Sequence, residues 1–344
     1  MTCGLRRSLF VFVGLIAVGT LLWHHELWGW LSASPTSAAR ADDTESEPIA
    51  VKALAEALKD KDAEVRKNAA QSLGRIGKQA KSAVSALTEA LKDSDVDVRG
   101  ASALALGRIG KDAGSAAPAL TALLKDKDHD VRGAAALALS RIGKDARSAV
   151  PALLELAKDE DKQLQAYAHC ALAVLEDDPR PHVAALAASL SDKSVEVRGT
   201  AAYILGELGP LAKDAVPALT DALKDKEAAV RRVAAQALGE MGSAAKSAVA
   251  RLAALLKDDD VDVRVSAASA LGEIGPDARE AVPALIEALK DSEVDVRGTA
   301  IDALGEIGPG ARAAIAALSR ALKDEDAEIR KAAALALGKI QEME

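Results

Sequence analysis

Aromatic residues are scarce in this sequence, at 2% of 344 residues, although hydrophobic residues make up 49%. All the tryptophans and phenylalanines lie within the first thirty residues, so Tyr167 and Tyr203 are the aromatic residues of the remaining chain. A core built with so few rings must rely on alanine and leucine, which disfavours an ordinary globular domain. The contrast between the first thirty residues and the rest predicts two segments with different roles.

Cysteine and histidine are also rare, with two and five residues. Cys3 lies in the first segment, so Cys170 has no partner for an intrachain disulfide once that segment is removed. A nucleophile formed by Cys170 and the adjacent His169 is disfavoured, because neighbouring helical residues point about 100° apart. The G-x-S-x-G and phosphate-loop motifs are absent from the sequence. We therefore predict a protein that is not an enzyme and has no cofactor.

Residues 1–41 have the order of a secretory signal peptide or a membrane anchor. Arg6 and Arg7 precede an apolar run from Leu9 to Trp23, and Ala39–Ala41 reads A-R-A, a small-residue cleavage pattern. The polar "HHE" after Trp23 favours cleavage over an uncleaved membrane span, and the arginine pair leaves a twin-arginine signal open. Either alternative predicts an exported protein, periplasmic or extracytoplasmic, that touches a membrane only through residues 1–41.

The rest of the chain is acidic. The sequence holds 44 basic and 52 acidic residues, a net charge of −8, and loss of residues 1–41 would remove more basic than acidic side chains. Residues 42–47, "DDTESE", form a short acidic linker. So acidic a body disfavours nucleic acid as a partner.

From residue 48 onward the sequence repeats every 33 residues, and residues 48–344 hold nine units without insertion or deletion. An arginine after Val or Ile marks the period, and Gln165 takes its place in the fourth unit. These arginines are Arg66, Arg99, Arg132, Arg198, Arg231, Arg264, Arg297 and Arg330. A fixed period of this length is typical of solenoid proteins.

Each unit reads as two helices. Apolar residues at i, i+3, i+4 and i+7 predict a first helix within Asp277–Asp291, which Pro283 either begins or kinks. The second helix, from Val296 to Ile307, is followed by Gly308, the residue type of a left-handed C-cap. The acidic residue four positions before most of the arginines is placed to cap the second helix. A single pair buries too little surface, so we predict an all-α fold, an α-solenoid of nine helix-pair repeats.

The recurring D-x-D-x-x-V-R and A-L-G-x-I-G phrases, as in Asp93–Gly110, resemble HEAT repeats. They are most similar to the short HEAT-like units also found in phycobilisome bilin lyases. The resemblance covers all nine units and implies an interaction scaffold whose second helices line a concave binding surface. A HEAT-like iron hydroxylase would need several His-Glu pairs in its repeats. His25-Glu26 in the first segment is the one such pair, so that enzyme class is excluded.

An aspartate recurs six positions before the arginine in every unit. The resemblance implies that these aspartates and arginines form a hydrogen-bonded ladder between successive units, a structural role. The aspartates are Asp60, Asp93, Asp126, Asp159, Asp192, Asp225, Asp258, Asp291 and Asp324. A calcium loop is disfavoured, because the positions counted from Asp93 that require Gly and Glu hold Val98 and Leu104. We therefore predict no metal site.

The second helix also carries positions that vary between units. The second, fifth and ninth positions after the arginine are three and four residues apart, so we expect them to share one outward face. The second and fifth positions supply Leu104, Leu137, Tyr167, Cys170 and Tyr203. The ninth position reads Arg75, Arg108, Arg141, Val174, Glu207, Glu240, Glu273, Glu306 and Lys339. Tyrosine is a frequent hot-spot residue, although both tyrosines could equally fill gaps where the fourth unit deviates. The row of three arginines followed by four glutamates predicts a dipolar groove, or the relic of duplicated blocks.

The fourth unit is irregular: it lacks the arginine, has Glu176 where other units have the capping glycine, and contains Pro179 and Pro181. We expect the curvature of the solenoid to change there. The sequence as a whole predicts an exported, non-catalytic scaffold that binds another protein through its concave second-helix face. The alternatives are a bilin-lyase-like enzyme component or small-ligand binder near Tyr167, Cys170 and Tyr203, and a spacer that acts by its length.

Overall fold

The computed structural model describes residues 49–341, and the predicted leader and acidic linker lie outside these residues. The described part of the chain folds into nine helix pairs, which confirms the predicted all-α solenoid. The first helices are α2 (Ile49–Ala57), α4 (Val84–Ala90), α6 (Ala117–Leu123), α8 (Val150–Leu156), α10 (Arg180–Ser189), α12 (Val216–Ala222), α14 (Val249–Leu255), α16 (Val282–Ala288) and α18 (Ile315–Ala321). The second helices are α3 (Ala63–Ile76), α5 (Val96–Ile109), α7 (His129–Ile142), α9 (Lys162–Leu175), α11 (Val195–Leu208), α13 (Ala228–Glu240), α15 (Val261–Ile274), α17 (Val294–Ile307) and α19 (Ala327–Gln341).

The first helix of most repeats is shorter than predicted, because a seven-residue 3₁₀ segment precedes it. In the eighth repeat, Gly275–Ala281 is a 3₁₀ helix, and α16 starts only at Val282, with Pro283 in its first turn. Proline is compatible with this position, where its missing N–H would have no helical partner. Pro283 therefore begins the helix and does not kink it, which is one of the two alternatives that the sequence left open.

In seven repeats a glycine with a positive φ follows the second helix, as predicted, but it does not have the left-handed helical conformation. Gly110 has φ 75° and ψ −138°, and its N–H donates to the carbonyl of Leu106. A residue with a Cβ atom is strained at these φ and ψ values, which explains why the position is glycine in so many repeats.

Aspartate caps begin most of the second helices. The carboxylate of Asp95 accepts hydrogen bonds from the N–H groups of Asp97 and Val98, at 3.0 and 3.2 Å. Glu227 and Glu293 occupy the same place in α13 and α17 and make no such bond. The longer glutamate side chain is the poorer cap, as the sequence predicts.

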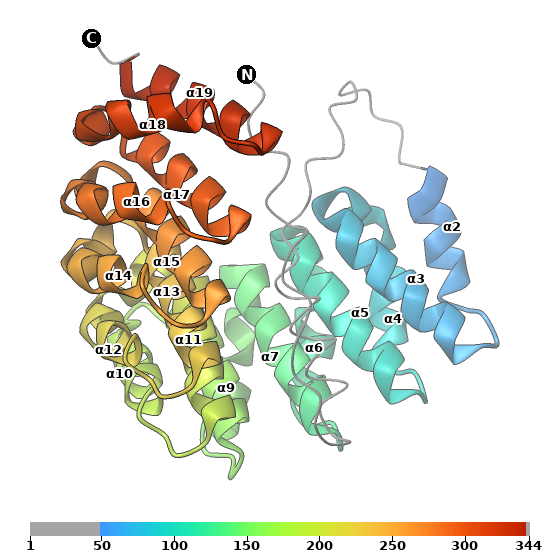
Figure 1. Ribbon diagram of the computed structural model, residues 1–344. Helices are drawn as coiled ribbons and strands as arrows, with labels where there is room; N and C mark the ends of the chain where they lie inside the picture. Colours follow the sequence, from blue (N-terminus) through green and yellow to red (C-terminus); the bar gives the residue numbers. More distant parts are fainter. Residues whose placement is uncertain (1–48, 342–344) are drawn as a thin grey trace.

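Neighbouring second helices contact each other far more extensively than neighbouring first helices do. This difference places the second helices on the inner side of a curved stack, and Figure 1 shows α11, α13, α15 and α17 inside the row α10 to α16. The close approach depends on small residues: a Cβ on Gly107 of α5 would lie 2.9 Å from the Cα of Ala138 in α7. The second glycine of A-L-G-x-I-G caps the helix, and the first brings successive helices together.

Candidate interaction surface

The aspartate and arginine of each repeat form a ladder between successive repeats. Arg99 donates from Nε and Nη2 to the carboxylate of Asp126 in the next repeat, at 2.8 and 3.0 Å. Its Nη1 donates to the carbonyls of Asp93 and Ser94 in its own loop. The carboxylate of Asp126 also accepts the N–H of Asp128, at 3.0 Å. Each rung therefore ties two repeats together and orders a loop, as charge-assisted bidentate pairs do.

Five rungs have this bidentate form: Arg66–Asp93, Arg99–Asp126, Arg198–Asp225, Arg231–Asp258 and Arg264–Asp291. The hydrogen bonds from Arg66 hold the pKa of Asp93 below its usual value. The rungs Arg132–Asp159 and Arg297–Asp324 are longer, at 3.8 and 3.6 Å. In both, the arginine Nε is buried without an acceptor among the described residues.

The ladder is interrupted after the fourth repeat. Gln165 Nε2 donates to the carbonyl of Asp159 at 2.7 Å, which replaces the arginine within its own loop. The amide of Gln165 is neutral and forms no ion pair with Asp192. The Asp192 carboxylate is paired with Lys162, whose side chain is exposed. The contact between α9 and α11 is also the least extensive between successive second helices. Figure 1 shows the stack of repeats turning in this region, between the arm that ends at α7 and the arm that starts at α11.

The predicted contact residues of the second and fifth positions do not face outward, with the exception of Tyr203, contrary to the prediction. Leu104, Leu137, Tyr167 and Cys170 are all buried. The reason is the close packing of second helices, which covers these positions with the neighbouring repeats. Tyr203 is half-buried, and the fifth positions further along the array are the polar Gln236, Ser269 and Asp302 and the exposed Leu335.

Tyr167 is a packing residue between α7 and α9. Its ring lies over Gly133, where a Cβ would come 3.0 Å from Cδ2 of the ring. Tyr167 is only 6% exposed, and burial raises the pKa of its hydroxyl above the usual range. The absent side chain of Gly133 thus makes room for the ring, which matches the gap-filling interpretation.

Cys170 is a buried free thiol. Burial raises its pKa to about 12, so the thiol is protonated at neutral pH and is a poor nucleophile. His169, its neighbour in sequence, instead contacts His182: the two Nδ1 atoms are 3.1 Å apart.

The ninth position faces the surface of the second-helix layer. Arg75, Glu240 and Glu273 are exposed, while Arg108 and Arg141 are half-buried. Burial, and then the charge of Arg141, lowers the pKa of Arg108. We call this set the ninth-position row: Arg75, Arg108, Arg141, Val174, Glu207, Glu240, Glu273, Glu306 and Lys339.

The basic and acidic parts of the ninth-position row meet in an ion pair. Arg141 Nη2 lies 2.7 Å from Glu207 Oε2 and 3.4 Å from the hydroxyl of Tyr203. The two charged residues belong to the third and fifth repeats, and the uncharged Val174 holds the ninth position between them. Burial opposes the charge of Arg141, but Glu207 and Tyr203 outweigh it and its pKa is raised. The sequence shows the change of sign but not this direct contact.

The acidic part of the row is paired at both ends and open in the middle. Glu306 is paired with Lys339 at 2.8 Å, and Glu207 with Arg141. Glu240 has no cationic partner among residues 49–341, and Glu273 accepts a hydrogen bond from Ser269 at 2.9 Å. Packing of the Glu240 carboxyl over Gly206, then the charges of Glu207 and Glu273, raises its pKa to about 7. The centre of the row is therefore a place where an added cation would be favourable.

A partly buried hydrogen-bonded chain of Glu176, His182 and His169 was not predicted. His182 Nε2 lies 3.0 Å from Glu176 Oε2, and its Nδ1 contacts His169. Burial, and then His182, lowers the pKa of His169. The chain links α9 to α10 where Glu176 replaces the capping glycine and no 3₁₀ segment precedes the helix. Glu176 and His182 are six positions apart, a spacing that matches no motif. The irregular sequence of the fourth unit was therefore the only feature of the sequence that could have pointed to this contact.

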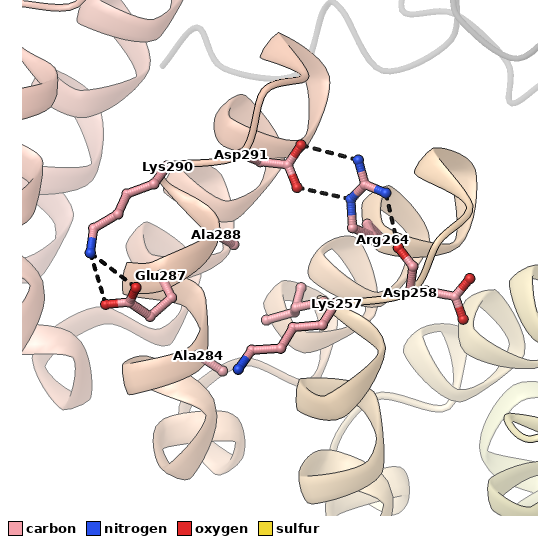
Figure 2. Close-up of a pocket in the computed structure, with 9 residues that line it drawn as sticks. Lys257, Asp258, Arg264, Ala284, Glu287, Ala288, Lys290 and Asp291 are labelled. Atoms are coloured by element: carbon pink, nitrogen blue, oxygen red, sulfur yellow. Dashed lines mark hydrogen bonds and ion pairs between the residues drawn. The ribbon is translucent and has the colours of Figure 1, made fainter.

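An open pocket of about 340 Å³ lies between the seventh and eighth repeats, with Leu256, Lys257, Ala284 and Ala288 in its lining. Figure 2 shows that its polar groups pair with one another: Arg264 with Asp291, and Lys290 with Glu287. Ladder residues form much of the wall, so the pocket is part of the repeat contact and offers no separate chemistry.

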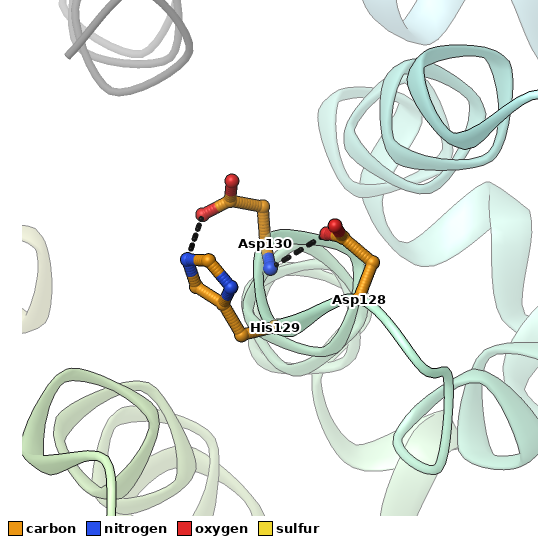
Figure 3. Close-up of side chains that lie close together, drawn as sticks. All are labelled: Asp128, His129 and Asp130. Carbon is orange, nitrogen blue, oxygen red and sulfur yellow. Dashed lines mark hydrogen bonds and ion pairs between the residues drawn. The ribbon is translucent and has the colours of Figure 1, made fainter. Parts of the chain in front are cut away.

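One group of side chains has the spacing of a metal site. Ligand atoms of Asp128, His129 and Asp130 lie within 4.8 Å of one another at the start of α7. Figure 3 shows the Asp128 carboxylate accepting from the N–H of Asp130, at 2.9 Å, and His129 beside the Asp130 carboxylate. This is the capping bond that other repeats make without a histidine, so we assign the cluster a structural role.

Repeated helix pairs, inner second helices and the Asp–Arg ladder together define an α-solenoid. Comparison with known families finds HEAT repeats at residues 38–93, 51–140, 84–173, 183–272 and 282–344, and a PBS lyase HEAT-like repeat at residues 263–291. The chain therefore belongs to the HEAT repeat family, whose members commonly bind other proteins. Among residues 49–341, no helix combines the length and apolar character that a membrane crossing requires.

No curated protein matches the sequence. Among solved structures, an engineered protein is similar, with 26% identity and a TM-score of 0.45 over 85% of this chain and 88% of that chain. Kap95p, studied in its binding to RanGDP, is similar with 17% identity and a TM-score of 0.44 over 85% of this chain. The match spans 45% of the Kap95p chain.

Proposed function

We propose that this protein is an exported, non-catalytic scaffold that binds another protein along the ninth-position row. The observation that carries the proposal is the ordered charge of that row, basic in the first three repeats and acidic from the fifth to the eighth, joined by Arg141 and Glu207. The partner that fits is a polypeptide with an acidic block and a basic block, because its acidic block can face the exposed Arg75 and its basic block the exposed Glu240 and Glu273.

Fewer of the predicted contact residues are available to a partner than the sequence suggests. Tyr203 borders the row beside Arg141, whereas Tyr167 and Cys170 lie in the packing of the array. A small-ligand site would need those two side chains to reach a ligand, so the scaffold function has the stronger support. A pure spacer would not require an ordered sign of charge on its inner surface.

Binding of two synthetic peptides of equal composition tests the proposal. One peptide carries a glutamate block and a lysine block, and the other carries the same residues in alternation. Fluorescence anisotropy should show the block peptide binding about tenfold more tightly, with an affinity that falls as salt rises. Equal affinity for the two peptides would contradict an ordered row.

Two double variants with unchanged net charge locate the surface. Arg75→Glu with Glu273→Lys disrupts both halves of the row and should abolish the preference for the block peptide. Lys81→Glu with Glu280→Lys makes the same exchange at exposed positions of the 3₁₀ segments and should leave the preference intact. Loss of the preference in the second variant would show that binding does not depend on the row.

Export is supported by the arginine pair, apolar run and A-R-A pattern of residues 1–41. N-terminal sequencing of protein recovered from the cell envelope should find a chain that starts at Asp42. A chain recovered in the cytoplasm would contradict export.

A further inference from the structure

The two ends of the described array expose the two halves of one internal contact. Within the array, each repeat presents a trailing face to the repeat after it and a leading face to the repeat before it. The trailing face of the ninth repeat contains Leu322, Arg330, Ala334 and Gly338. The leading face of the first repeat contains Asp60, Val65 and Ser72.

The exposure of these residues shows that they belong to a contact made elsewhere in the chain. Val65 is 40% exposed, whereas the residues equivalent to it in all later repeats, such as Val98 and Val131, are buried. Leu322 is also 40% exposed, while Leu91 and Leu124 at the same place in earlier repeats are buried. Ala334 is exposed as well, although its equivalents Ala103, Ala136 and Ile301 are buried.

The ladder ends in two complementary half-rungs. Arg330 Nη1 donates to the carbonyls of Asp324 and Glu325, at 2.7 and 2.9 Å, as every ladder arginine does within its own loop. Its Nε and Nη2, which donate to the next aspartate in the five bidentate rungs, have no acceptor among residues 49–341. At the other end, the Asp60 carboxylate accepts the N–H of Asp62 at 2.8 Å and has no arginine partner in the described chain.

The contact between successive second helices is also left incomplete at both ends of the described array. Gly338 occupies the place of Gly107, whose absent side chain admits Ala138 of the next repeat, and nothing lies within 4 Å of the Cβ position of Gly338. The residue of the first repeat equivalent to Ala138 is Ser72, which is also small. Lys331 on the trailing face is no obstacle, because Lys67 and Arg232 occupy the same position inside the array.

We propose that copies of this chain stack end to end, with the trailing face of the ninth repeat on the leading face of the first repeat of the next copy. Arg330 pairs with Asp60 in this contact, and Gly338 packs on Ser72. The contact keeps the register of the internal contacts, because Arg330 and Gly338 occupy the places of Arg99 and Gly107, and Asp60 and Ser72 those of Asp126 and Ala138. The contact joins two different faces, so it extends into chains of copies rather than closing into a two-fold dimer.

Sedimentation velocity of the full chain over a range of concentrations tests the stacking. The wild-type sedimentation coefficient should rise with concentration, and Arg330→Glu or Asp60→Arg should each hold the protein as a monomer. An equimolar mixture of these two variants should associate again, because one variant keeps Asp60 and the other keeps Arg330, so that the wild-type contact can form between them. A wild type that stays monomeric, or a mixture that fails to associate, would overturn the proposal.

Two further variants separate stacking from folding. Gly338→Leu fills the open space on the trailing face and also favours the helix, so it should give a well-folded monomer. Arg320→Glu makes the same charge change as Arg330→Glu on α18, at a position whose equivalents Glu89 and Glu287 remain exposed inside the array. It should associate like the wild type, and loss of association in this control would show that net charge, not the end face, governs it.

Discussion

Arg141 and Glu207 form an ion pair across an entire intervening repeat, with 66 positions between them in sequence and 2.7 Å between Nη2 and Oε2. The uncharged Val174 occupies the ninth position of the intervening repeat. It joins the basic and acidic halves of the ninth-position row beside the interruption of the ladder at Gln165. The basic and acidic blocks, which are separated by a neutral repeat in the sequence, are therefore in direct contact in the folded chain.

A double-mutant cycle on Arg141 and Glu207 should give a coupling free energy of about 1 kcal/mol. The side chains are 22% and 30% exposed, so solvent screens the pair only in part. The free energies of unfolding of Arg141→Gln, Glu207→Gln and the double variant, measured in urea, supply the cycle. A coupling that vanishes at low salt would show that the contact does not stabilise the array.

Gly107→Ala should destabilise the protein by about 1–3 kcal/mol, although alanine is the better helix former. The new Cβ would lie 2.9 Å from the Cα of Ala138, and a backbone atom cannot move aside cheaply. Gly199→Ala is the matched control, because nothing lies within 4 Å of its Cβ position in α11. Thermal unfolding should show a lower midpoint for the first variant and an unchanged or higher midpoint for the second.

Gln165→Arg should restore the missing rung to Asp192 and stabilise the contact between the fourth and fifth repeats by about 0.5–1.5 kcal/mol. Hydrogen exchange of the amides in α10 and α11 should slow. The control Gln163→Arg adds the same charge to α9 at a position with no ladder role. Equal protection by both variants would attribute the effect to charge alone.

Ser102→Ala should stabilise the protein by about 1–2 kcal/mol. The Ser102 hydroxyl is fully buried and has no hydrogen-bond partner among the described residues. The equivalent residue of every other repeat is alanine, including Ala135 and Ala168. The reverse change, Ala135→Ser, should lower the urea midpoint by a comparable amount, and an opposite order of midpoints would be inconsistent with a buried unpaired hydroxyl.

Glu240 should make stability depend on pH near neutrality. Its pKa is raised from 4.5 to about 7 in the folded chain, so the folded state binds its proton more tightly than the unfolded state does. The favourable contribution is complete below the unfolded pKa and is lost as the pH rises through about 7. Glu240→Gln should therefore gain stability over the wild type most clearly at about pH 8, with the difference shrinking toward about pH 5. A difference that does not vary with pH would contradict the raised pKa.

Much of the architecture could be predicted because it depends on residues that are close in sequence and recur in every unit. The helix caps illustrate this: Asp95 bonds to N–H groups two and three residues away, and Gly110 to a carbonyl four residues away. The 3₁₀ segments were missed, since their apolar spacing does not separate them from the α-helix that follows.

The surface was predicted less well, because exposure depends on how closely neighbouring repeats approach. Tyr167 falls on a position that would face outward on an isolated helix pair, but α7 comes close enough at Gly133 to cover it. The contact between His169 and His182 likewise needs the loop of the fourth repeat to bring α10 back onto α9.

The sequence by itself determined the period, the helix pairs and their caps, because local hydrogen bonding and a fixed repeat length leave one arrangement for each. The ladder was expected from the resemblance to HEAT repeats. The tertiary structure alone decided which variable positions are covered and which charges meet. Those outcomes depend on the spacing and direction of successive second helices. That spacing follows from the packing of glycine against alanine between repeats, and a single repeat contains only half of that contact.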